Sequence, residues 1–232
     1  MTRKIAICVP ARDTMEMETA QSIVAMSTQF AVDFVATGQA SLQFYWMNGT
    51  LLPDMRNDLV KAALKSGATH LLWIDSDMKF PKDALTRLLA HDAPIVGANY
   101  PQRKRPVKPT AARIAQNGER VWVYTPPEEH QKTQLEAVES LGLGLCLIEA
   151  AVFEVTPEPW FSMVWSDAKK QHMGEDVFFF RRVKEAIDVD PMIDHALSRE
   201  VYHIGKHSYE WQDAYDDFHL LIEAQKPREA AE

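Results

Sequence analysis

Two aspartates stand one residue apart where an apolar stretch of the chain ends. Residues 70–74 read HLLWI, which is typical of a buried strand, and Asp75 and Asp77 follow with Ser76 between them. Side chains alternate along extended backbone, so the two carboxylates project to one side and Ser76 to the other. Two like charges at a strand end repel unless a cation or several donors lie between them. Such oxygen ligands suit Mg²⁺ or Mn²⁺, so the spacing indicates a divalent metal site. The alternative is a helix cap beside a solvated carboxylate.

The segments around this motif alternate between strand-like and helix-like patterns. We expect strands at 5–9, 41–48, 70–74 and 93–100. We expect helices at 16–36, 54–65 and 81–89, the second capped by Asp54 and stopped by Gly67. This β-α-β order predicts an α/β fold with a mostly parallel central sheet flanked by helices. Parallel sheets carry functional groups at the carboxyl ends of their strands, which is where Asp75 and Asp77 stand.

The second half of the chain has a different texture. A basic, proline-rich loop at 101–109 precedes an expected hairpin that turns at Asn117 and Gly118. After a polar segment at 126–134, we expect a strand and a short helix in 140–155, a helix at 174–187, a short strand at 201–205 and a final amphipathic helix. The hairpin predicts a smaller antiparallel portion beside the main sheet.

The composition indicates a single soluble domain. The chain has 232 residues, 46% of them hydrophobic, which is enough for one large α/β domain. Its formal net charge of −8 argues against a surface built as a whole to hold nucleic acid. Cys8 and Cys146 lie in apolar runs and are expected as core residues in a reducing cytoplasm. The apolar start is too short for a signal peptide, and no run approaches the roughly 18 residues of a membrane helix.

The order of several motifs resembles that of GT-A fold glycosyltransferases, over residues 4–206. The matching pieces are IAICVPARD (5–13), MRNDLVKAAL (55–64), LLWIDSDMKFPKDALTRLL (71–89), GLGLCLIEAAVF (142–153), GEDVFFFRRVKEA (174–186) and VYHIG (201–205). The chain is most similar to small, single-domain, family-2-like members found in phage and bacterial genomes. The resemblance implies a GT-A (Rossmann-like) domain that transfers a sugar from a nucleotide-diphosphate donor, with a UDP-sugar favoured. It also implies a cytoplasmic protein, located in the host cytoplasm if the chain is encoded by a phage.

The resemblance also divides the chain. Residues 1–100 would bind the nucleotide sugar, residues 101–206 would hold the acceptor and the catalytic groups, and residues 207–232 would form a C-terminal helix and tail. Residues in the DSD segment would bind Mn²⁺ or Mg²⁺ on the diphosphate of the donor.

Roles in metal binding follow from the same resemblance. Asp77 would be the direct ligand, and Asp75 would contact the ribose or reach the metal through water, with Ser76 in the same donor-binding segment. His203 in VYHIG matches a late histidine that completes the coordination. His195 is a nearby competitor for that role.

The nucleotide would lie over the end of the first strand. Pro10, Arg12 and Asp13 line that turn, and Asp13 stands where relatives read the base. Arg56 would meet a phosphate or ribose, because the forked donors of arginine suit such oxygens. The ordinary alternative for both arginines is a surface charge.

The resemblance places catalysis at residues 174–186. Asp176 would deprotonate the acceptor hydroxyl, with Glu175 as the second candidate. Acidic residues in a first helical turn are also good capping chemistry. Arg181 and Arg182 would reach the diphosphate or form a solvated face.

Four cations lie within six residues of the basic loop, namely Arg103, Lys104, Arg105 and Lys108. Three interpretations stay open for them. They could clamp the donor diphosphate, contact an anionic acceptor such as DNA carrying a modified base, or form a solvated loop. The acidic total charge favours a saccharide acceptor.

Two small residues and two aromatic residues complete the candidate set. Gly142 and Gly144 would either form the floor of the acceptor site or let a bulged strand pack closely. Trp160 and Phe161 are more consistent with core packing than with stacking on a sugar.

Two other classes of protein remain as alternatives. A nucleotidyltransferase would share the sheet and the metal-binding aspartates, but PARDTMEME (10–18) lacks the glycine-rich loop that such enzymes carry after the first strand. The other alternative is a non-catalytic sugar-nucleotide or carbohydrate binder, a degenerate relative of the family. The presence of the full candidate set counts against it, namely Asp75, Asp77, Glu175, Asp176 and His203.

Overall fold

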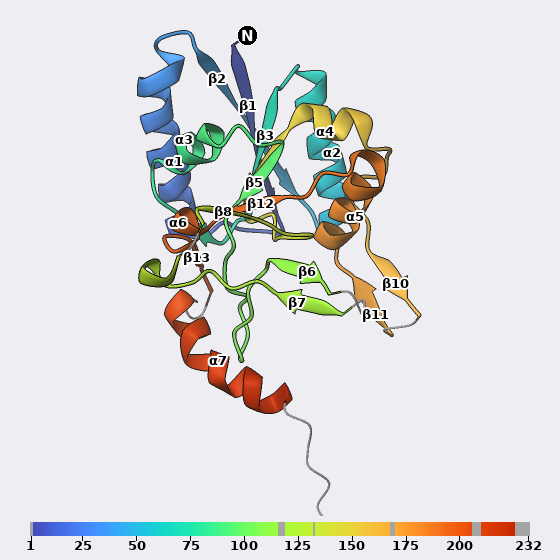
Figure 1. Ribbon diagram of the computed structural model, residues 1–232. Helices are drawn as coiled ribbons and strands as arrows, with labels where there is room; N and C mark the ends of the chain where they lie inside the picture. Colours follow the sequence, from blue (N-terminus) through green and yellow to red (C-terminus); the bar gives the residue numbers. More distant parts are fainter. Residues whose placement is uncertain (1, 116–118, 132, 168–169, 206–209, 226–232) are drawn as a thin grey trace, which may run out of the picture.

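The protein is a mixed α/β fold built around one seven-stranded sheet (Figure 1). The computed structural model describes residues 2–115, 119–131, 133–167, 170–205 and 210–225, with side chains up to residue 218. The strands of the central sheet, in spatial order, are β2 (Ala40–Asn48), β1 (Arg3–Ala11), β3 (His70–Ile74), β9 (Leu145–Glu149), β5 (Ile95–Gly97), β12 (Met192–Asp194) and β8 (Leu135–Ala137).

Five of the seven strands run in the same direction. β1 pairs in parallel with β2 and β3, and β5 pairs in parallel with β12. The two reversed strands are β9, which is inserted between β3 and β5, and β8 at the sheet edge. The prediction of a mostly parallel sheet is confirmed in this sense, and β9 adds antiparallel ladders in its centre.

Helices cover both faces of the sheet because successive side chains of its central strands are buried on opposite sides. On one side, α1 (Met17–Phe30), the short π-helix η1 (Ala31–Val35) and α3 (Ala84–Ala90) pack on a core that includes Ile7, Leu72 and Leu147. On the other side, α2 (Leu52–Lys65), α4 (Ala150–Val155) and α5 (Glu175–Ile187) pack on a core that includes Trp73 and Cys146.

Short elements surround the carboxyl end of the sheet. Three two-stranded pairs lie there: β6 (Ala112–Ile114) with β7 (Arg120–Trp122), β10 (Val164–Ser166) with β11 (Gln171–Met173), and β4 (Met78–Lys79) with β13 (Tyr202–His203). The remaining elements are the 3₁₀ turn η2 (Glu128–His130), α6 (His195–Ser198) and α7 (Trp211–Gln225). The hairpins confirm the predicted antiparallel portion, although the turn at Asn117 and Gly118 lies outside the described residues.

Several element ends differ from the sequence-based expectation. Asp54 is not a cap, because α2 follows Leu51 and Asp54 lies in its first turn, with no side-chain cap bond at that end. The helix expected from residue 81 begins at Ala84, and the strand expected at 93–100 is limited to Ile95–Gly97. Gly67 does stop α2, since its φ of 73° is left-handed.

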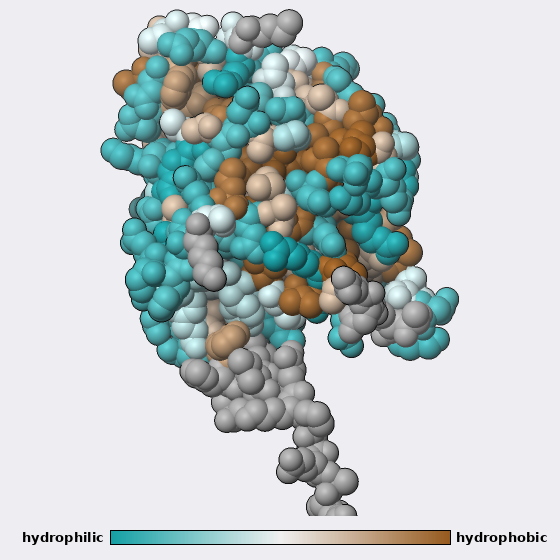
Figure 2. All heavy atoms as spheres, in the orientation of Figure 1, coloured by the Kyte–Doolittle hydropathy of each residue, from teal (hydrophilic) through white to brown (hydrophobic). Residues whose placement is uncertain are grey.

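The surface of the protein has two different halves in the view of Figure 2. Apolar residues gather over the right half of this face, where α2, α4 and α5 lie in Figure 1, and polar residues predominate on the left. Within the described residues, every helix is too short or too polar to cross a membrane.

Candidate functional site

The DSD segment forms a turn that three other parts of the chain fix in place. The amide of Asp75 donates to the carbonyl of Gly144 at 3.1 Å, which continues the β3–β9 ladder. The carbonyl of Ser76 accepts from the Glu16 amide at 2.8 Å, just before α1. The carbonyl of Asp77 accepts from the Ile204 amide at 2.7 Å, beside β13. These bonds hold the two carboxylates at the carboxyl end of β3, as the sequence predicts.

Arg56 joins Asp75 to the start of α5. Its Nη2 lies 2.8 Å from Asp75 Oδ1, and its Nε lies 3.5 Å from Glu175 Oε1. Burial lowers the pKa of Arg56, but the charges of Asp75 and Glu175 raise it by more than burial lowers it. The pKa of Arg56 is therefore above its usual value. One buried guanidinium therefore connects the DSD segment with a candidate base 100 residues further along the chain.

The surroundings of Arg56 are apolar and rigid. Its guanidinium lies 5.3 Å from the ring centre of Trp73 and 6.0 Å from that of Phe161, and the side chain is only 2% exposed. The next residue, Asn57, accepts from the amides of Trp160 and Phe161 and donates to the Phe161 carbonyl. Trp160 and Phe161 are thus core residues that support Arg56, as their sequence context favours.

The Arg56 side chain also keeps free donor capacity. Nη1 is buried and has no hydrogen-bond partner among the described residues, and Nε has the 3.5 Å ion-pair contact with Glu175 but no hydrogen bond. A buried donor of this kind gains from an oxygen atom of a water or a ligand. The expected contact of Arg56 with a phosphate or ribose is compatible with this geometry, although its observed partners are the two carboxylates.

Asp77 has different neighbours from Asp75. Its Oδ2 lies 2.9 Å from Arg103 Nη1 and 3.4 Å from His203 Nε2. The other ring nitrogen of His203, Nδ1, lies 3.0 Å from the Pro101 carbonyl oxygen. A carbonyl oxygen only accepts, so Nδ1 carries a proton. In the neutral ring, Nε2 then presents a lone pair beside Asp77 Oδ2, and a cation between the two atoms could be bound by both.

Glu175 and Asp176 open α5 directly after Gly174. Burial raises the pKa of Glu175, while Arg56 opposes the shift. Burial also raises the pKa of Asp176, opposed mainly by the Val177 amide, which donates to Asp176 Oδ1 at 2.7 Å. The charge of Asp75 also contributes to raising both pKa values. We call Asp75, Glu175 and Asp176, which lie around Arg56 and the start of α5, the carboxylate cluster.

Two residues that the sequence did not single out border this cluster. Arg120 of β7 interacts electrostatically with Asp176, which partly offsets the lowering of the Arg120 pKa by burial. Tyr100 follows β5, and its Oη accepts from the Gly144 amide at 2.9 Å. Burial raises the pKa of Tyr100 well above 10.0, and Asp75 adds to the shift. Its only sequence signal is a polar ring at the end of an apolar strand.

The role of Gly142 and Gly144 follows from Tyr100. A Cβ at Gly142 would lie 2.3 Å from Tyr100 Oη, and one at Gly144 would lie 2.6 Å from it. Contacts under 3.0 Å require something to shift. The close-packing interpretation therefore accounts for both glycines, since they make room for the phenol.

The turn after β1 lies apart from these contacts. Pro10 is a buried residue of β1. Arg12 and Asp13 form an ion pair at 3.5 Å, with side chains 80% and 79% exposed. Both residues lie on a surface loop, so a nucleotide base that contacts them would bind at the protein surface.

The basic loop is largely engaged within the protein. Besides the Arg103–Asp77 pair, Arg105 contacts Asp213 at 2.6 Å and Asp217 at 3.2 Å, both on α7. The Lys108 ammonium lies 5.8 Å from the ring centre of Trp122, and Lys104 is exposed. These contacts reduce the number of cations that an anionic acceptor could use.

Arg181 and Arg182 do not point to the carboxylate cluster. Arg181 contacts the Met173 sulfur at 4.0 Å, and Arg182 donates to the Pro157 carbonyl. Their roles are consistent with a solvated face of α5.

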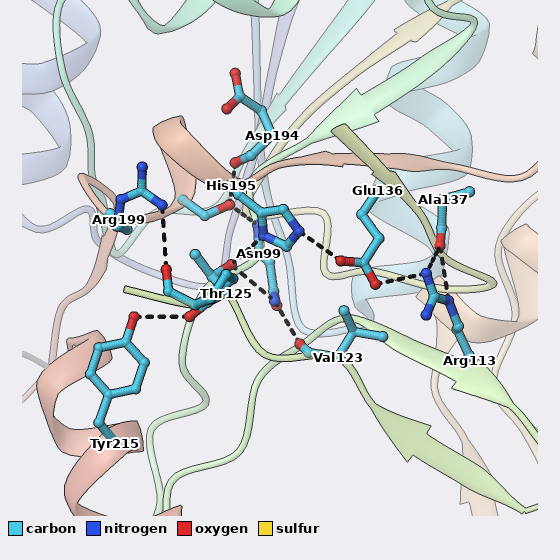
Figure 3. A network of polar contacts seen from close by, with 12 residues as sticks. Asn99, Arg113, Val123, Thr125, Glu136, Ala137, Asp194, His195, Arg199 and Tyr215 are labelled. Carbon is cyan, nitrogen blue, oxygen red and sulfur yellow. Dashed lines mark hydrogen bonds and ion pairs between the residues drawn. The ribbon is translucent and has the colours of Figure 1, made fainter. Parts of the chain in front are cut away.

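His195 belongs to a different polar network, shown in Figure 3. Its Nε2 lies 2.8 Å from Glu136 Oε2, and its Nδ1 lies 3.2 Å from Thr125 Oγ1. Glu136 in turn pairs with Arg113 at 2.7 Å. Both ring nitrogens of His195 are therefore occupied, whereas His203 lies beside Asp77.

The donor atoms at Asp77 fit a divalent cation. A carboxylate oxygen and an imidazole nitrogen face one another, and the second nitrogen of the imidazole is fixed by a backbone carbonyl, as is usual for histidine ligands. Asp77 and His203 would hold the ion. In the described part of the chain, however, no group of three or more His, Cys, Asp or Glu side chains is arranged to hold a metal.

The cysteines confirm their predicted role. Cys8 and Cys146 are buried free thiols in β1 and β9, separated by β3. Burial raises the pKa of Cys8 to about 12. Neither thiol is a nucleophile in the folded protein.

The fold and site together define a mixed α/β protein with a carboxylate cluster at the carboxyl end of its central sheet. Among solved structures, A197 from STIV is similar to this chain, with a TM-score of 0.56 and 13% identity over 88% of this chain and 87% of that one. This likeness shows the fold alone. No protein-family model matches the chain, and no curated protein matches it significantly.

Proposed function

We propose that this protein is a metal-dependent glycosyltransferase that moves a sugar from a nucleotide-diphosphate donor, a UDP-sugar by preference, to an acceptor hydroxyl. The observation that supports it most strongly is the connection through Arg56 between Asp75 of the DSD segment and Glu175 at the start of α5. The two segments that the family resemblance assigns to donor binding and catalysis are in contact.

The charges around Asp77 suit the departure of a diphosphate. Asp77 and His203 would hold Mn²⁺ or Mg²⁺, and such an ion would supply positive charge to a departing diphosphate. Arg103 lies beside Asp77, so its guanidinium can bind phosphate oxygens from the same side. Arg56 orients the Asp75 carboxylate.

Asp176 is the preferred base among the two acidic residues of α5. Glu175 is engaged by the Arg56 guanidinium, which favours its ionised, paired form. The raised pKa of Asp176 makes it a better proton acceptor at neutral pH than an ordinary aspartate. In the proposed step, the acceptor O–H gives its proton to Asp176 as the oxygen attacks the anomeric carbon. The bond from that carbon to the phosphate oxygen breaks, and the diphosphate leaves with the electron pair.

A saccharide is the preferred acceptor. Arg103 and Arg105 of the basic loop are in ion pairs with acidic residues of the same chain. A DNA phosphate would have to displace these pairs, while a neutral saccharide hydroxyl would not. Binding to DNA carrying a modified base remains the alternative, and it would weaken steeply with salt.

Donor binding is tested by thermal unfolding with UDP-, GDP-, CDP- and TDP-sugars, each with and without Mn²⁺. A donor present at 100 times its Kd adds about 2.7 kcal/mol of stability. That corresponds to a rise in Tm of roughly 5–10 °C for a chain of this size. We expect one nucleotide to give this shift only with Mn²⁺.

Variants connect the shift to the proposed residues. Asp77→Asn should remove the Mn²⁺-dependent part of the shift, and Asp58→Asn, an exposed position on α2, is the control that should keep it. Asp176→Asn should keep the shift. Its rate of nucleotide-sugar hydrolysis, measured as release of the nucleoside diphosphate, should fall by roughly 10²–10⁴-fold. If no nucleotide sugar stabilises the wild type, or if Asp77→Asn leaves the shift unchanged, the proposed function is wrong.

A further inference from the structure

The guanidinium of Arg103 lies on the same Asp77 oxygen that faces His203. Its Nη1 lies 2.9 Å from Asp77 Oδ2 and 3.1 Å from the carbonyl oxygen of Ile204. The same carboxylate oxygen is 3.4 Å from His203 Nε2. Arg103 thus neutralises Asp77 from within the chain.

A divalent ion bound to Asp77 Oδ2 and the Arg103 guanidinium on the same oxygen would repel one another. Mg²⁺ binds carboxylate oxygens at about 2.0–2.1 Å, so an ion there would stand within a few ångströms of the Arg103 charge. A charge of +2 and a charge of +1 about 4 Å apart repel strongly even at the dielectric constant of water. Metal binding at Asp77 therefore opposes the observed position of Arg103.

The Arg103 side chain can leave without any change in its loop. The loop backbone is closed by the Gln102 amide, which donates to the Lys108 carbonyl at 2.8 Å. It is also attached to α7 through Arg105 and Asp213. The Arg103 side chain is 44% exposed, so a rotation about its own bonds moves the guanidinium into solvent or onto a ligand.

We propose that Arg103 is the resident cation of Asp77 in the donor-free protein and becomes a ligand of the donor diphosphate when the donor binds. This inference rests on the proposed function. A diphosphate offers several anionic oxygens to the planar fork of an arginine, so it compensates Arg103 for the loss of Asp77. Metal ion and diphosphate then bind with positive coupling, each raising the affinity for the other.

The test separates the two partners of Arg103. Binding of Mn²⁺ alone is measured from the electron paramagnetic resonance signal of the free ion. Binding of UDP alone is measured calorimetrically in buffer with a chelator and no divalent metal. The variants are Arg103→Gln and, as the matched control, Lys104→Gln, which removes the same charge from the neighbouring exposed position. Asp77→Asn is included as the variant that lacks the metal ligand.

The proposal predicts opposite changes in the two affinities. Arg103→Gln should bind Mn²⁺ at least about tenfold more tightly than the wild type, because the variant lacks the guanidinium charge that repels the ion. It should bind UDP at least about tenfold more weakly, since a charge-assisted contact is lost. Lys104→Gln should stay within about twofold of the wild type in both measurements.

Other results would overturn the inference in distinguishable ways. If Arg103→Gln binds Mn²⁺ no more tightly than Lys104→Gln, Arg103 is not the resident cation, while loss of Mn²⁺ binding in Asp77→Asn would still support the proposed function. If UDP affinity does not fall in Arg103→Gln, Arg103 is not a diphosphate ligand. If Asp77→Asn binds Mn²⁺ as the wild type does, both this inference and the proposed metal site fail.

Discussion

Replacing Arg56 by methionine tests the central contact of the site. Methionine has a similar length and fits an apolar environment between Trp73 and Phe161. The substitution leaves Asp75 and Glu175 without the cation that lies 2.8 Å and 3.5 Å from them. We therefore expect a folded protein that is less stable at neutral pH because two partly buried carboxylates repel one another.

The size of the effect follows from the charges and their exposure. A pair of unit charges 3.5–4 Å apart interacts by about 4–5 kcal/mol at an effective dielectric constant of about 20. Removing one partner of a buried pair costs about 3–5 kcal/mol. Asp75 and Glu175 are 26% and 16% exposed, so water replaces part of the lost interaction. We expect a loss of about 2–3 kcal/mol in the free energy of unfolding at pH 8.

The loss should depend on pH in a defined direction. Burial already raises the pKa of Glu175 above 4.5, and Arg56 is the main opposing group. Without Arg56, the pKa of Glu175 rises further. A carboxyl whose pKa is higher in the folded protein binds more protons there, so the variant loses stability as pH rises above about 4.5, until the raised pKa is passed. The difference from wild type should therefore be smaller at pH 5 than at pH 8.

Urea unfolding of both proteins at pH 8 and pH 5 measures these differences. The double variant Arg56→Met/Glu175→Gln supplies the control, because it removes one of the two carboxylate charges. It should recover about 1–2 kcal/mol relative to Arg56→Met alone at pH 8. A destabilisation that is the same at both pH values, or a double variant no more stable than the single one, would contradict the role of Arg56 as the shared cation.

Three further outcomes follow from the site and the core. Gly142→Ala should cost about 1–3 kcal/mol in urea unfolding, because its Cβ would lie 2.3 Å from Tyr100 Oη; an unchanged stability would show that the phenol moves freely. A disulfide reagent at pH 8 should leave Cys8 and Cys146 unmodified in the native protein and label both after unfolding in guanidinium, and rapid native labelling would contradict their burial. The acid limb of the kcat/KM pH profile should have a midpoint above pH 3.8, because burial raises the pKa of Asp176, and kcat/KM should fall as pH drops through that midpoint. If the same acid limb persists in Asp176→Asn, the titrating group is not Asp176.

The fold could be predicted wherever the information is local. The run HLLWI became β3 with the predicted ends, and Asp75 and Asp77 follow it at the carboxyl end of the sheet. Continuous apolar runs and left-handed stops such as Gly67 act within a few residues, so they can be read directly. The position of β9 between β3 and β5 could not be read, because strand order depends on pairings between segments far apart in the chain.

The same distinction holds for the candidate site. The spacing of Asp75 and Asp77 singled them out, and the family resemblance singled out Glu175 and Asp176. The contact of Arg56 with Glu175, however, spans more than a hundred residues. The different partners of His195 and His203 also needed the structure, since both residues lie in similar short apolar segments. Tyr100 was missed because a buried tyrosine at a strand end has the same pattern as an ordinary core residue.

The two aspartates of the DSD segment are not equivalent, because their arginine partners differ in burial. Arg56 is 2% exposed and held between aromatic rings, so Asp75 keeps a permanent counter-ion. Arg103 is 44% exposed, so the counter-ion of Asp77 can exchange. An exchangeable partner is what a carboxylate needs if it is to accept a metal ion during a reaction cycle, whereas a permanent partner suits a carboxylate that orients its surroundings. The exposure of their partners thus favours Asp77 over Asp75 as the direct ligand, which is the role that the family resemblance implies for Asp77.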